Sequence, residues 1–102
     1  MKTTRTFESF SQFLINVYSK QNGGKFLSQN NYLSYIRNVI KHLGISESQF
    51  LNAELTLLKA WFRQLEDKPS FRKVSAEYRN DLKSGFNAFI NYGRYQVGYV
   101  TY

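Results

Sequence analysis

Apolar side chains recur three and four positions apart along most of the 102-residue chain, which is the spacing of one face of an α-helix. The pattern is interrupted at residues 21–24, at Gly44 and at residues 67–70, where glycine or proline ends helices. It predicts four helices, and a capping box at Ser46–Gln49 predicts a further short helix or turn. The four helices are expected at residues 6–20, 28–43, 52–66 and 75–92.

Particular residues mark the expected helix ends and the expected core. Thr6 and Ser75 suit N-cap positions, and Gly44 suits the left-handed residue that follows a helix. The second helix is expected to bury either Tyr35 or Ile36, and Phe71 is expected to anchor the loop after the third helix. The other core positions read from the stripes are Phe7, Phe10, Leu14, Val17, Tyr32, Val39, Leu43, Leu55, Leu58, Phe62, Leu65, Tyr78, Leu82, Phe86, Phe89 and Ile90.

The last nine residues change character. Gly93 is expected to end the final helix, and Tyr95, Val97 and Tyr99 then alternate with smaller or polar residues, a period of two that is typical of extended chain. The expected fold is therefore all-α, a compact bundle of four to five helices with a short extended C-terminal tail. Residues 1–93 form the helical domain, and residues 94–102 form a tail or a linker toward a further domain.

Composition excludes several kinds of chemistry. The chain has no cysteine and a single histidine, His42, which excludes disulfides, zinc–thiolate sites and multi-histidine metal centres. Glu77 and Asp81 lie four apart on a helix, a spacing better explained by solvated acids near a helix N-terminus than by catalysis. No run approaches the roughly 18 apolar residues of a membrane span, and no signal-peptide core is found. We expect a cytoplasmic binding protein without cofactor or metal, and not an enzyme.

Positive charge is the strongest functional signal. Fourteen lysines and arginines against 7 acidic residues give a net charge of +7, which favours polyanionic partners. Two helix faces concentrate cations with amides and a hydroxyl, and further cations stand in the loops before these helices. The candidate DNA-binding residues are Lys25, Asn30, Ser34, Arg37, Lys41, Arg72, Lys73, Arg79, Asn80, Lys83 and Asn87.

These residue types suit double-stranded DNA. Arginine and lysine neutralise phosphates, while asparagine can pair with adenine and arginine with guanine in the major groove. Taken singly, each residue is better explained by helix solvation, whereas two such faces on one basic chain favour DNA. The alternative is a protein-interaction module that uses an apolar groove and the aromatic C-terminal tail. Single-stranded nucleic acid, bound by stacking on exposed tyrosines, is a third hypothesis.

Two stretches of the sequence, SQNNYLSY at residues 28–35 and RNDLKSGFNAFINY at residues 79–92, carry a family likeness. They resemble the second and closing helices of the N-terminal, SAM-like core-binding domain of phage-integrase-type tyrosine recombinases, with Asn31 where that family usually has threonine. KPSF at residues 68–71, followed by RND at residues 79–81, is similar to the helical N-terminal module of some modification-dependent restriction endonucleases. Both likenesses imply DNA contact in recombination, integration or restriction, with catalysis carried by a separate domain.

Overall fold

The computed structural model describes residues 5–18 and 29–96, and every regular element within these ranges is a helix. The predicted all-α bundle is confirmed. The elements are α1 (Phe7–Phe13), a π-helical turn η1 (Leu14–Tyr18), α3 (Gln29–Leu43), α4 (Glu47–Leu51), α5 (Leu55–Leu65), α6 (Pro69–Arg72) and α7 (Ala76–Gln96).

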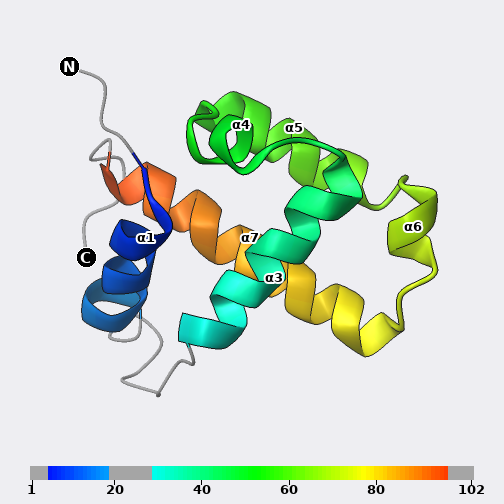
Figure 1. The fold of residues 1–102 in the computed structure, drawn as a ribbon, viewed down its shortest axis with the longest axis horizontal. Coiled ribbons are helices and arrows are strands. Elements are labelled where there is room, and N and C mark those ends of the chain that lie inside the picture. Colours follow the sequence, from blue (N-terminus) through cyan, green and yellow to red (C-terminus); the bar gives the residue numbers. More distant parts are fainter. Residues whose placement is uncertain (1–4, 19–28, 97–102) are drawn as a thin grey trace.

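The long helix α7 forms the base on which the other elements pack (Figure 1). Helix α3 crosses α7, α5 packs against α7 beside it, and α1 contacts both α3 and the C-terminal half of α7. The short helix α6 lies at the opposite end of the molecule from α1, next to the first turns of α7 (Figure 1). Helix α7 is therefore flanked by α5 and α6 on one side and by α1 and α3 on the other.

Three predicted helix ends are confirmed. The Thr6 hydroxyl accepts a hydrogen bond from the Ser9 backbone N–H at 3.0 Å, and the Ser9 hydroxyl accepts one from the Thr6 N–H at 3.1 Å. Ser46 and Gln49 form the second capping box, with hydrogen bonds of 3.1 and 2.9 Å. Gly44 has φ of +73°, a left-handed conformation that costs glycine little because it has no Cβ.

Two predicted boundaries are wrong. The segment after Lys68 was expected to be a loop, but it forms the one-turn helix α6 with Pro69 at its start, where a missing N–H costs nothing. Helix α7 continues through Gly93 to Gln96 instead of ending at Gly93. A Cβ at Gly93 would lie 3.0 Å from Leu55 Cδ2, so this glycine serves the close approach of α5. Residues 97–102, the rest of the predicted tail, lie outside the described residues.

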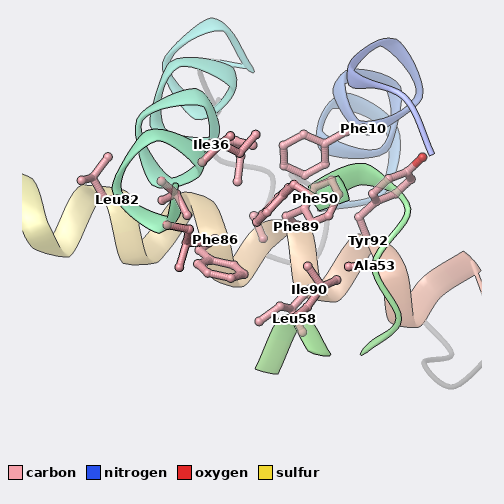
Figure 2. Close-up of a cluster of buried hydrophobic side chains, with 14 of the residues drawn as sticks. Phe10, Ile36, Phe50, Ala53, Leu58, Leu82, Phe86, Phe89, Ile90 and Tyr92 are labelled. Carbon is pink, nitrogen blue, oxygen red and sulfur yellow. The ribbon is translucent and has the colours of Figure 1, made fainter. Parts of the chain in front are cut away.

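An aromatic cluster forms the centre of the core (Figure 2). The Phe89 ring lies 5.2 Å from Phe10 and 4.7 Å from Phe50, and Phe50 lies 5.3 Å from Phe86, so α1, α4 and α7 meet here. Of the two alternatives on α3, Ile36 is completely buried, whereas Tyr35 stays partly exposed. The predicted core positions that are buried are Phe10, Leu14, Val39, Leu43, Leu58, Leu65, Phe71, Leu82, Phe86, Phe89 and Ile90, and those left partly exposed are Phe7, Val17, Tyr32, Leu55, Phe62 and Tyr78.

The crossing of α3 over α7 depends on Gly85. A Cβ built on Gly85 would lie 2.7 Å from the Tyr35 Cβ, which is closer than non-bonded carbon atoms approach each other in proteins. About two helical turns earlier along α7, Asn38 of α3 donates a hydrogen bond of 2.7 Å to the Tyr78 hydroxyl. The two helices therefore touch through a glycine and are held in register by one polar pair.

Gly85→Ala should lower the free energy of unfolding by about 1–3 kcal/mol, because the added methyl group forces the two helices apart. Urea unfolding followed by circular dichroism measures the change. Ser84→Ala is the matched control, since Ser84 is exposed on the same helix and alanine there should be neutral or slightly stabilising. Equal stability of Gly85→Ala and the wild type would show that the crossing does not depend on this contact.

Arg5 ties the start of the described chain to two distant segments. Its guanidinium donates to the backbone oxygens of Leu51, at 3.1 Å, and Ala53, and its Nε donates to the Gln96 side chain at 3.1 Å. Burial lowers the pKa of the Arg5 guanidinium below its ordinary value. The arginine thus satisfies carbonyl groups between α4 and α5 that lack helical partners.

Arg5→Met keeps an apolar stem but removes all the donors, and it should lower the free energy of unfolding by about 1–3 kcal/mol. Lys73→Met provides the control, because Lys73 is exposed at the end of α6 and its loss should change stability by less than about 0.5 kcal/mol. Thermal unfolding of both variants at one ionic strength checks the difference. A wild-type melting temperature for Arg5→Met would contradict a stabilising role.

Candidate functional site

The predicted polar face of α3 is present and solvent-exposed. Asn30, Ser34, Arg37 and Lys41 are all exposed. The Arg37 guanidinium lies over the Phe7 ring, 5.0 Å from its centroid, which draws this cation toward α1. Lys25, the loop cation predicted beside this face, lies outside the described residues.

The predicted face of α7 is also present. Asn80 and Asn87 are exposed, while Arg79 and Lys83 are partly buried because they lean against α6 and α5. The loop cations Arg72 and Lys73 are exposed at the C-terminal end of α6.

The two faces do not form one continuous surface. At about 100° per residue, the four polar residues of α3 lie roughly 100–160° around their helix from Tyr35, which faces α7. The corresponding residues of α7 lie roughly 120–160° around their helix from Gly85, which faces α3. Since Tyr35 and Gly85 mark the contact between the helices, the faces point away from each other. The prediction of two DNA-facing helices therefore yields two separate surfaces.

One groove brings together three of the seven predicted cations. It lies between α6, the end of α5 and the first turns of α7, and its volume is about 510 Å³. The polar residues that line it are Glu66, Arg72, Arg79, Asn80 and Lys83. Residues that are up to eleven positions apart in sequence, Arg72 and Lys83, are thus brought to one site.

Backbone hydrogen bonds position the arginines of this groove. Arg72 Nε donates to the Glu66 carbonyl oxygen at 2.9 Å, and Arg79 Nη1 donates to the Arg72 carbonyl oxygen at 3.2 Å. Arg72 Nη2 also lies 3.4 Å from Asp67 Oδ1, an exposed ion pair that contributes little to stability. The arginines are held in place while part of each guanidinium stays available to a ligand.

Lys83 sits between a carboxylate and an aromatic ring. Its ammonium pairs with the Glu66 carboxylate and lies 5.9 Å from the centroid of the Phe62 ring. The hydrogen bond from Lys83 and the charges of Lys83 and Arg79 lower the pKa of Glu66 below its ordinary value of 4.5. At neutral pH Glu66 is therefore ionised and partly neutralises the groove.

A second groove follows α7 toward its C-terminal end. It has a volume of about 250 Å³ and lies between α5 and α7, over a floor of Phe62 and Ile90. Its polar lining consists of Lys59, Arg63, Asn87, Asn91 and Arg94.

Only Asn87 of this second set was singled out from the sequence. Arg94 was missed because Gly93 was expected to end the helix, which assigned Arg94 to the tail. The missed signal is the run Asn80, Lys83, Asn87, Asn91 and Arg94, spaced three and four apart, which continues one helix face through Gly93.

His42, Glu77 and Asp81 are the other groups that the sequence singles out. His42 Nδ1 hydrogen-bonds Ser70 Oγ at 2.8 Å and its ring packs edge-on against Phe71, so it docks α6 on α3. Glu77 and Asp81 are both exposed. The pKa of Tyr35 is raised, mainly because this side chain is partly buried and to a lesser extent because the negative charge of Asp81 is nearby. Across residues 5–18 and 29–96, no cluster of histidines and acids could hold a metal ion, and no helix is long and apolar enough to cross a bilayer.

Comparison of the chain with protein-family models, curated proteins and solved structures yields no significant match. The likeness to recombinase core-binding domains and to restriction-endonuclease modules therefore stays a prediction.

Lys83→Met should raise the pKa of Glu66 back toward 4.5. The variant lacks both the hydrogen bond to Glu66 and the positive charge that lowers this pKa most. A lowered pKa in the folded state means that the pair stabilises the fold above pH 4.5 and that this contribution is lost as the pH falls through the folded pKa. A pH titration of the Glu66 side-chain carboxyl carbon by NMR measures the shift. Lys59→Met is the control and should leave Glu66 unchanged; identical Glu66 titration in the wild type and Lys83→Met would contradict the pairing.

Proposed function

We propose that this protein binds double-stranded DNA through the groove between α6 and the first half of α7. The observation that carries the proposal is the convergence of Arg72, Arg79 and Lys83 on one groove, with the exposed amide of Asn80 beside them. The arginines and Lys83 contact backbone phosphates, and Lys73 at the end of α6 adds a further exposed cation. Asn80 is the candidate for a base edge, since an asparagine amide pairs with adenine.

The groove suits a duplex better than an unpaired strand. Phe71 is the aromatic residue in its lining, and this ring is only 2% exposed, so it offers bases no face to stack on. Recognition of single strands without such rings loses the stacking contribution of about 1–3 kcal/mol per base. An α-helix has the dimensions of the major groove, and the first half of α7 presents one face, with Asn80, to solvent.

Glu66 tunes the affinity of this site. Its carboxylate occupies Lys83 and repels phosphate, so a ligand must displace part of this ion pair. Binding therefore depends on ionic strength and remains moderate, as expected for a contact made mainly to the backbone.

The α3 face contributes less in this proposal. Asn30, Ser34, Arg37 and Lys41 point away from the groove, so a straight duplex on α7 does not reach them. Asn87 lines the second groove, and Lys25 stays a predicted contact that lies outside the described residues. Both grooves on α7 are lined by cations and amides, which favours a polyanion over an apolar partner segment. The protein-interaction alternative stays a prediction that depends on the C-terminal tail.

The proposal gives the chain a binding role. The likeness to recombinase core-binding domains supports the same ligand, and it implies that a separate catalytic domain cuts or joins the DNA in integration or recombination. The residues of the α6–α7 groove hold and orient a duplex in this arrangement and take no chemical step.

Arg79→Gln with Lys83→Gln should reduce affinity for a labelled duplex of about 20 base pairs by roughly tenfold or more, and lower the salt slope by about two, because two phosphate contacts are lost. Fluorescence anisotropy at several salt concentrations measures both values. Arg37→Gln with Lys41→Gln is the matched control: it removes the same charge from the α3 face and should have a smaller effect. Equal losses in the two variants, or no wild-type binding at low salt, would overturn the proposal.

A further inference from the structure

The second groove on α7 carries positive charge that has no acidic counterpart. Three cations, Lys59, Arg63 and Arg94, line it together with the amides of Asn87 and Asn91, and the lining contains no carboxylate. Within the part of the chain that the structure describes, the salt bridges are Arg72 with Asp67 and Lys83 with Glu66, and both involve the first groove. The second groove is therefore the more favourable of the two for an anion.

The amides and the floor add to the chemistry of this groove. Asn87 and Asn91 stand one turn apart on α7, so their side-chain amides can donate to neighbouring oxygens of one ligand. Phe62 and Ile90 beneath them are apolar, and Ile90 is only 7% exposed, which limits water behind a bound phosphate. Phosphodiester oxygens are strong hydrogen-bond acceptors, and the cations and amide groups of this lining are donors. The two therefore match.

The two grooves share one face of α7. The residues that α7 supplies to the first are Ala76, Arg79, Asn80 and Lys83, and those it supplies to the second are Asn87, Ile90, Asn91 and Arg94. At 1.5 Å per residue, Arg79 and Arg94 are separated by roughly 22 Å along the helix axis. Along the axis of a B-form duplex each strand carries one phosphate per about 3.4 Å, so roughly six base pairs span this distance.

We propose that the second groove is a phosphate-binding subsite that continues the first, so that one strand of a nucleic-acid backbone follows α7 past both grooves. The inference rests on the proposed function and extends it by naming Lys59, Arg63, Asn91 and Arg94 as backbone contacts. Lys83, which lies between the grooves over the Phe62 ring, joins the two subsites. A compact anion occupies one groove at most, whereas a continuous backbone occupies both.

Lys59→Gln with Arg63→Gln tests the subsite, because both residues are exposed on α5 and their loss should leave the fold intact. Two DNA hairpins serve as probes, with stems of about 4 and about 12 base pairs, which are about 14 and about 41 Å long. The wild type should bind the long stem at least tenfold more tightly than the short one after correction for the number of binding positions. In Lys59→Gln with Arg63→Gln this ratio should fall toward one, and the salt slope on the long stem should fall by about two.

The controls separate this inference from the proposed function. Arg37→Gln with Lys41→Gln, on the α3 face, removes the same charge and should keep the wild-type ratio. An equal fall in both variants would assign the effect to net charge and overturn the subsite. The subsite alone would be overturned if Lys59→Gln with Arg63→Gln kept the wild-type ratio of affinities while Arg79→Gln with Lys83→Gln bound DNA weakly. Failure of the wild type to bind either hairpin would overturn both proposals, and equally tight binding of a polyglutamate peptide would overturn the assignment to phosphodiesters.

Discussion

The close approach of α3 and α7 at Gly85 is the constraint on which the rest of the structure depends. With no side chain at that position, the two longest helices of the described chain touch through Tyr35, and their apolar faces close over Phe50 and Phe89. The same contact decides which residues stay outside. It turns the cations of α3 and those of α7 to different sides of the helix pair, and it leaves the outer face of α7 open between α5 and α6.

Along the outer face of α7, the cations have acidic partners near α6 and have none in the groove farther along the helix. Near α6, Glu66 and Asp67 partner Lys83 and Arg72, so the cations there are positioned but partly neutralised. Farther along, the lysine and arginines beside Phe62 have no carboxylate in their groove. An anionic ligand is thus needed more in the second groove, at the C-terminal end of α7, than in the first. The first groove positions a ligand, and the second adds affinity for it.

Local chemistry made much of the fold predictable from the sequence. The capping boxes at Thr6 and Ser46 and the glycine at position 44 act within one helical turn, so their residues alone determine the helix ends. Gly93 could not be interpreted in this way, because its role is set by Leu55, which approaches it from another helix. The site divides similarly: the spacing along α7 was visible, but the contribution of α5 and the opposite orientation of α3 depend on how the helices pack.

The Arg5–Gln96 hydrogen bond joins residues 91 positions apart, so the described chain enters and leaves the fold at the same place. This place is at the far end of α7 from α6 (Figure 1). Both points lie about 30 Å along α7 from the α6 end of the helix, so the first groove is remote from them. Such a topology also suits insertion of the whole module into a surface loop of a host protein, because a host needs only two neighbouring attachment points.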